Sequence, residues 1–217
     1  MRRRHFLTLS AQCPLLVYAL DGQLIPQPAG PSVDVPLRFF TTLEAKIVEA
    51  ATSRIFPSDE SGPGARDAGV TLYIDRQLAG PYGRDRYRYV QPPFADGSPE
   101  QGYQSAANPR QIYRQHLKLL AGFHSLTPRE QDERLRSIER TYFFRLLRQH
   151  TLEGMFCDPM HGGNRDLIGW QLIGFPGPYM SWARDVDQHS GQAFRPPPQS
   201  LSQILNRPVR PWEDLEP

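Results

Sequence analysis

The chain has 217 residues, a length that suits one domain with long appendages, and it contains 22 prolines and 17 glycines. Proline at about twice its usual frequency, with a mean hydropathy of −0.54, predicts a modest core surrounded by much irregular chain. The formal net charge is +2, and removal of Arg2, Arg3 and Arg4 would leave −1, so no basic stripe remains that could bind nucleic acid.

The chain begins with three arginines that run into an apolar stretch ending at Leu20. A membrane-spanning helix needs about 20 apolar residues, and this stretch is shorter. A basic flank before a short apolar core is typical of an export signal. The order Arg3-Arg4-x-Phe6-Leu7 resembles the twin-arginine signal, which directs folded proteins out of the cytoplasm. We expect residues 1–20 to be such a signal; an ordinary secretory signal or an uncleaved basic end is the alternative.

Residues 21–38 are rich in proline and glycine and are predicted to be an extended linker. A helix is expected over residues 42–55, because Thr41 and Glu44 have the spacing of a capping box and Pro57 follows the last apolar position. Its predicted buried face consists of Leu43, Ile47, Ala50, Ala51 and Ile55. A second helix is expected over residues 65–79, with Val70, Ile74 and Leu78 on one face.

Residues 82–108 are predicted to be a long irregular segment with five scattered aromatic residues: Tyr82, Tyr87, Tyr89, Phe94 and Tyr103. Loops longer than about 15 residues are uncommon inside compact domains and are usually functional. These aromatic side chains therefore either pack onto the chain's own helices or form a surface for a partner.

Two further helix starts follow. Asn108 before Pro109 predicts a helix whose buried face consists of Ile112, His116, Leu119, Leu120 and Phe123, with His116 as a satisfied core histidine. Thr127, Pro128 and Glu130 predict the start of the longest helix, which should reach about Leu152 and end at Gly154. Its expected buried side consists of Leu135, Ile138, Tyr142, Leu146 and Gln149.

The remaining chain predicts a short helix near residues 167–172 and a helical turn near 201–206 within an extended, proline-rich tail over residues 181–217. No strand pattern of any length occurs. The expected fold class is therefore all-α, with about four main helices in a helical domain over residues 39–180 and long irregular loops.

The stretch from Cys157 to His161 holds a thiol, a carboxylate and an imidazole within five residues. A zinc site needs three or four converging ligands, and a Cys–His nucleophile pair usually comes from distant parts of a fold, so neither is well supported. Asp158-Pro159 and Gly162-Gly163-Asn164 instead favour a shaped loop. The chain lacks a dinucleotide-binding fingerprint, a haem-attachment motif and a nucleophile elbow.

Two segments, together with the Arg-Arg-x-Phe-Leu start, resemble the small subunit (subunit 3) of the gluconate 2-dehydrogenase family. They run from Phe39 to Asp75 and from Gly154 to Gly177, and the resemblance covers roughly residues 1–180. It implies a non-catalytic chain without a cofactor or metal. It also implies an FAD-containing large subunit that oxidises a sugar or sugar acid, and a multihaem cytochrome c subunit that carries haem c. The complex would lie in the periplasm, associated with the inner membrane.

The resemblance further implies that the export machinery reads Arg3, Arg4, Phe6 and Leu7, and that the large subunit is exported as a passenger. The implied partner interface consists of Cys157, Asp158, His161, Gly162, Gly163, Asn164 and Trp170. Cys157 would be the single cysteine left after removal of the signal, which makes it a candidate for an intersubunit disulfide. The alternatives are a stand-alone exported metal- or thiol-dependent protein that uses the Cys157–His161 loop, and a binding protein exported for another partner.

Overall fold

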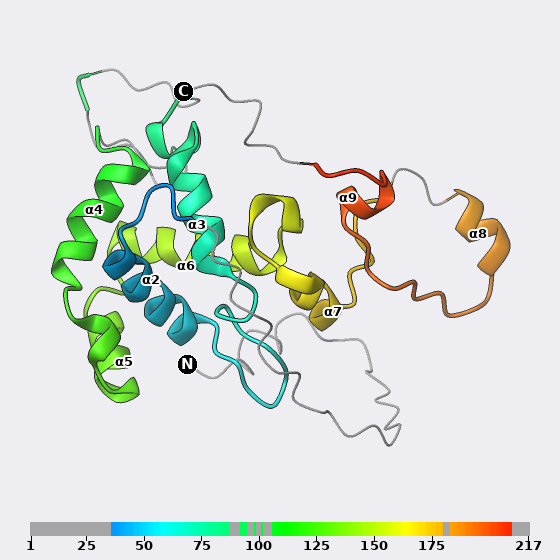
Figure 1. Cartoon of the computed structure of the whole chain (residues 1–217), viewed down its shortest axis with the longest axis horizontal. Coiled ribbons are helices and arrows are strands. Elements are labelled where there is room, and N and C mark those ends of the chain that lie inside the picture. The colour runs from blue at the N-terminus through cyan, green and yellow to red at the C-terminus, as the bar shows by residue number, and fades with distance from the viewer. Residues whose placement is uncertain are drawn as a thin grey trace. The chain divides into compact units, whose positions relative to one another are not determined.

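The computed structural model describes residues 36–86, 92–94, 98, 101, 106–179 and 183–209. The predicted export residues Arg3, Arg4, Phe6 and Leu7 lie outside these ranges. The helical elements are α2 (Thr42–Ile55), α3 (Val70–Ala79), η1 (Tyr82–Arg84), α4 (Pro109–Leu119), η3 (Phe123–Ser125), α5 (Pro128–Ser137), α6 (Tyr142–Phe156), η4 (Pro159–His161), η5 (Arg165–Leu167), α7 (Ile168–Ile173), α8 (Ala183–His189) and α9 (Leu201–Ile204) (Figure 1). The described residues form helices and no β-strand, which confirms the all-α prediction.

Helix α3 lies at the centre of the core, where it packs against α2, α6 and η1. Val70, Ile74 and Leu78 are fully buried, as the helical spacing predicted. The helix begins five residues later than expected. Gly69 adopts a left-handed conformation with φ of 70°, and residues 65–69 form turns instead of a helical turn.

The predicted starts of α2 and α4 are correct, but their buried faces differ in part from the prediction. Leu43 on α2 is 55% exposed, whereas Val48 and Thr52 are buried. On α4, Leu119 is 65% exposed, whereas Tyr113 and Leu117 are buried. Leu120 and Phe123 are buried as predicted, but both lie beyond α4, which ends at Leu119. The prediction placed Leu119 on the buried face because it continued the helix through residue 123.

The prediction of one helix from Pro128 to about Leu152 is wrong, because the chain breaks between α5 and α6. The Thr141 hydroxyl donates to the carbonyl of Ile138 at 2.7 Å and accepts the N–H of Phe144 at 3.2 Å, so it ends one helix and caps the next. Gly154 does not end α6, which continues to Phe156. The missing side chain instead lets α6 approach Val70 and Tyr73 of α3 closely.

The chain enters the core through residues 36–40, which span the end of the predicted linker (residues 21–38) and the start of the predicted helical domain (residues 39–180). The buried carboxylate of Asp75 on α3 accepts three successive backbone N–H groups, those of residues 38, 39 and 40, at 2.7, 2.9 and 2.8 Å. Arg76 donates to the carbonyl of Pro36 at 3.1 Å. Residues 36–40 are therefore fixed to the central helix before α2 begins.

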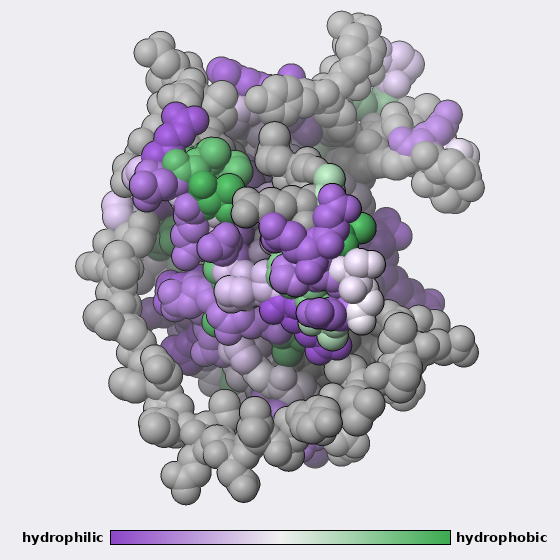
Figure 2. Space-filling view, turned by 90° about the vertical axis from the view of Figure 1, so that its right-hand side faces the viewer, coloured by the Kyte–Doolittle hydropathy of each residue, from purple (hydrophilic) through white to green (hydrophobic). Residues whose placement is uncertain are grey.

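The predicted C-terminal tail contains two short helices, α8 and α9, of which only the turn near α9 was expected. Figure 2 looks onto the side of the molecule that carries both, and apolar groups (green) reach the surface there among hydrophilic ones (purple). None of the helices in the described part of the chain is both long and apolar enough to cross a membrane.

Candidate functional site

The loop between α6 and α7, residues 157–164, is shaped by helix caps and left-handed residues. Cys157 caps α6 by donating its N–H to the carbonyl of Glu153 at 2.8 Å, and Asp158 then caps η4 by accepting the N–H of Met160 at 3.0 Å. Gly162 and Asn164 both have positive φ, 94° and 46°. The loop therefore has turns at Gly162 and Asn164, where the backbone is left-handed.

Asn164 holds this loop together from inside. Its side chain is fully buried; Nδ2 donates to the carbonyl of Cys157 at 2.8 Å and Oδ1 accepts the N–H of Gly169 at 2.8 Å. Its backbone N–H donates to the carbonyl of Gly154 at 2.8 Å. One residue thus joins the last turn of α6, the start of the loop and α7.

Two glycines are required by close backbone approaches around Asn164. A Cβ atom on Gly163 would overlap the carbonyl oxygen of Gly154, and one on Gly169 would overlap that of Met155. The Gly163 and Gly169 backbones therefore lie directly against α6. This close contact explains why a glycine-rich segment forms a compact layer on the helix.

The predicted interface residues fall into two groups. Gly163, Asn164 and Trp170 are buried within the chain, and the Trp170 indole donates to the carbonyl of Phe156 at 2.7 Å. Cys157, Asp158, His161 and Gly162 are half-buried and form the outer side of the loop. The buried group stabilises the loop, and the half-buried group is the part that a partner could reach. Contact with a partner stays a prediction.

Burial controls the protonation of the two reactive groups on the loop. It raises the pKa of the Cys157 thiol to about 12 and lowers the pKa of His161. At neutral pH the loop therefore carries a protonated thiol and a neutral imidazole, not the thiolate that a nucleophile requires. Among the described residues, no three His, Cys, Asp or Glu side chains are grouped so that they could hold a metal ion.

Asp158 also connects the loop to the C-terminal part of the chain. Its Oδ1 atom accepts the N–H of Met160, while Oδ2 accepts the N–H of Leu201, the first residue of α9, at 2.7 Å. A hollow of about 720 Å³ lies beside this contact, between residues 159–160 and 200–209. No pattern in the sequence indicates this contact, because the two partners are 43 residues apart.

A second polar cluster, centred on His150, was also missed by the sequence analysis. Its Nε2 atom lies 2.8 Å from the hydroxyl of Tyr82 and its Nδ1 atom lies 2.8 Å from that of Tyr113. Burial lowers the pKa of His150 to about 4, so the ring is neutral and one tyrosine donates while the other accepts. The helical spacing of Leu146, His150 and Gly154 on α6 could have identified His150, whereas the predicted Gln149 is exposed.

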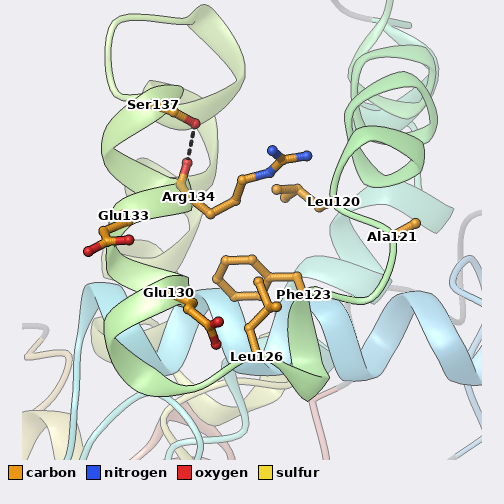
Figure 3. A pocket seen from close by; sticks show the side chains of 8 residues that line it. All are labelled: Leu120, Ala121, Phe123, Leu126, Glu130, Glu133, Arg134 and Ser137. Atoms are coloured by element: carbon orange, nitrogen blue, oxygen red, sulfur yellow. Dashed lines mark hydrogen bonds between the residues drawn. The ribbon is translucent and has the colours of Figure 1, made fainter.

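A further hollow, of about 470 Å³, lies between the end of α4 and α5 (Figure 3). Its polar side chains already have partners, either within α5 or between α5 and the end of α4. Glu130 accepts the N–H of Thr127 at 2.8 Å, and Arg134 donates to the carbonyl of Leu119 at 2.8 Å. We therefore place the candidate site on the α6–α7 loop, not here.

Comparison with known proteins bears directly on this loop. The family of gluconate 2-dehydrogenase subunit 3 matches residues 42–177, a range that covers the helical core and the whole α6–α7 loop. No curated protein and no solved structure matches the chain. Since the match extends over more than half of the sequence and includes the core, the α6–α7 loop and α7, the chain belongs to the gluconate 2-dehydrogenase subunit 3 family.

Proposed function

We propose that this chain is the non-catalytic small subunit of a periplasmic, FAD-dependent sugar or sugar-acid dehydrogenase. Its role would be the export, folding and assembly of the flavoprotein large subunit. The family match over residues 42–177 carries the proposal, because it identifies a subunit of a multi-subunit dehydrogenase. FAD and haem c would be held by the large subunit and a multihaem cytochrome c subunit, near the inner membrane.

The chemistry of the α6–α7 loop supports a contact role. The carboxylate of Asp158 accepts hydrogen bonds from two backbone N–H groups, and the thiol of Cys157 is protonated at neutral pH, so neither group is set up for catalysis. A preformed loop with half-buried polar groups binds a partner with little ordering cost. We therefore place the contact with the large subunit on the outer side of this loop, at Cys157, Asp158, His161 and Gly162.

Replacement of Arg3 and Arg4 by lysine tests the export role. Both subunits should then stay in the cytoplasm, because the export receptor reads the arginine pair. The matched control is Arg2→Lys, which changes a neighbouring arginine outside the pair and should leave export unchanged. Immunoblots of periplasmic and cytoplasmic fractions decide the question, and a large subunit that still reaches the periplasm with R3K/R4K would refute the passenger role.

Purification through an affinity tag on this chain tests the composition of the complex. The visible absorption bands of flavin and haem should co-elute with the tagged chain, and the chain expressed alone should carry neither. A stoichiometric metal ion on the isolated chain would instead support the stand-alone metal- or thiol-dependent alternative built on Cys157 and His161.

Cys157 is also proposed to form a disulfide with the large subunit. The thiol of Cys157 and a thiol of the large subunit would together lose two protons and two electrons to a disulfide-containing oxidant of the periplasm. Electrophoresis of the purified complex without reductant should then show one joined species that separates on reduction, and Cys157→Ser should abolish it. A small subunit that migrates alone without reductant would exclude the disulfide and leave the subunit assignment intact.

A further inference from the structure

The C-terminal arm, defined as residues 173–209, carries an unusual share of the exposed apolar surface. Seven of the twelve exposed large hydrophobic side chains among the described residues lie in it: Ile173, Phe175, Tyr179, Val186, Phe194, Ile204 and Leu205. Single exposed apolar residues are ordinary, but a concentration of them in one segment marks an interaction surface.

The arm has almost no core of its own. None of the described side chains of α8 or α9 is buried, and Val186 on α8 is 63% exposed. Helices of seven and four residues are too short to be stable in water without a surface to pack on. The arm therefore keeps apolar side chains exposed in the described part of this chain, although Phe175 packs against Trp170 and Phe194 stacks on His189.

Two hydrogen bonds, one to a backbone carbonyl and one to a side-chain carboxylate, fix where the arm leaves and rejoins the protein. The N–H of Gln199 donates to the carbonyl of Pro176 at 3.0 Å, and the N–H of Leu201 donates to Asp158 at 2.7 Å. The intervening segment, which carries α8, starts and ends at this closure. The arm is consequently anchored on the outer side of the α6–α7 loop, one residue from Cys157.

The composition of the arm indicates the chemistry of its partner. It contains three arginines and two aspartates, a formal net charge of only +1 in the whole segment. A surface for an anionic membrane or for nucleic acid needs clustered basic residues, which the arm lacks. Aromatic and aliphatic side chains with few charges instead match the core of a protein–protein interface.

We infer that the C-terminal arm is a second docking element for the dehydrogenase large subunit. It binds a weakly charged, apolar surface of that subunit, continuous with the region that the α6–α7 loop contacts. This inference rests on the proposed function, because the large subunit is the partner to which it commits. The arm and the loop then form one interface, joined by Asp158.

The test measures binding of the co-expressed large subunit to the full-length chain and to Val186→Asp and Phe194→Asp. Each substitution should raise Kd about tenfold or more, because a buried apolar contact is replaced by a desolvated charge. The control matched to Val186 is Leu119→Asp on α4. Leu119 is 65% exposed, close to the 63% of Val186, but it lies outside the arm, so this substitution should change Kd less than about twofold. Circular dichroism should show the wild-type fold for all three, since each altered side chain is exposed.

Hydrogen exchange of the wild-type chain gives a second readout that needs no substitution: amides of residues 173–209 should become protected when the large subunit is added. If the wild-type chain binds the large subunit but the arm variants bind equally well and the arm gains no protection, the arm inference is wrong and the proposed function stands. If the wild-type chain captures no large subunit, both fail. Arm variants that disrupt only self-association would assign the arm to a second copy of this chain and overturn the inference.

Discussion

The hydroxyl of Tyr113 lies 2.8 Å from Nδ1 of His150, and the two rings stack with an interplanar angle of 14°. Both side chains are buried, and the opposite ring nitrogen of His150 contacts Tyr82. A core histidine with both nitrogens occupied by tyrosine hydroxyls joins α4, α6 and η1. It has a direct consequence for the acid stability of the protein.

Stability should fall as the pH drops from about 6.5 to about 4. The unfolded chain binds a proton at His150 below its ordinary pKa of about 6.5, whereas burial lowers the pKa in the folded chain to about 4. The stabilisation is therefore complete above pH 6.5 and is lost on acidification, by roughly 3 kcal/mol in total. Urea unfolding at pH 7, 5.5 and 4.5 measures this slope. His150→Gln should lower stability at pH 7 and flatten the slope; an unchanged slope would contradict the assignment.

Asn164→Ala should destabilise the protein by about 3 kcal/mol, because it leaves the N–H of Gly169 and the carbonyl of Cys157 buried without their side-chain partner. Asn206→Ala is the matched control, since Asn206 also has a positive φ, 49°, but is exposed. Asn206→Ala should lower the free energy of unfolding by about 1 kcal/mol, which is the cost of holding alanine in a left-handed backbone conformation without any loss of buried hydrogen bonds. Equal losses in chemical denaturation would show that the Asn164 hydrogen bonds contribute nothing.

Gly169→Ala should destabilise the protein severely, by about 3 kcal/mol or more, because the new methyl group would overlap the Met155 carbonyl oxygen and force α7 away from α6. Gly122→Ala serves as the control: that position has φ of 79° and no atom near the added Cβ, so only backbone strain applies. Thermal melting of the two variants would show the difference. Similar melting temperatures would mean that the close approach at Gly169 relaxes freely.

Asp75→Asn should make the chain more sensitive to trypsin after Arg38. The carboxylate now accepts three backbone N–H groups, two on Oδ1 and one on Oδ2, whereas an amide has one acceptor oxygen and turns an N–H donor toward at least one of them. The weakened segment should open more often, and cleavage should be about tenfold faster or more for a loss near 1.4 kcal/mol. The exposed Glu139→Gln is the control, and mass spectrometry of the fragments reports the cut. If trypsin cleaves Asp75→Asn and the control at the same rate after Arg38, Asp75 does not anchor residues 36–40 to α3.

Cys157 should react slowly with an alkylating reagent at pH 7.5 in the folded chain, because burial raises the pKa of its thiol to about 12 and only the thiolate reacts. The experiment uses a Cys13→Ser background, so that a single thiol is followed. Unfolding in urea should restore the alkylation rate of an ordinary cysteine. That rate should be at least tenfold higher than in the folded chain, because unfolding lowers the thiol pKa by more than one unit. Equal rates in the folded and unfolded chain would show that the thiol is not protected.

Three helix starts could be predicted from the sequence because their chemistry is local, whereas the predicted start of α3 is five residues too early. Thr41 with Glu44, Asn108 with Pro109, and Thr127 with Glu130 all cap helices at the expected positions. Helix ends and breaks could not, because they depend on distant contacts. Gly154 stays inside α6 since it lies against α3, and Thr141 divides α5 from α6 with only half of a capping box to announce it.

The sequence located the α6–α7 loop through its turn-forming residues but could not divide it into an inner and an outer side. Asn164 and Trp170 are predicted partner-interface residues, yet both are buried within the chain because folding brings their hydrogen-bond partners to them. The contact of Asp158 with Leu201 joins segments that no local pattern relates.

The attachment of residues 36–40 to Asp75 also determines how the folded protein responds to mechanical load. A pulling force applied to the chain before Pro36 reaches the hydrogen bonds of Asp75 before it reaches the first turn of α2. Since Asp75 lies on the central helix α3, the load passes into the middle of the core and does not peel α2 away from its end. Residues 36–40 therefore transfer a load on the chain before Pro36 to α3 and shield the first turn of α2 from it.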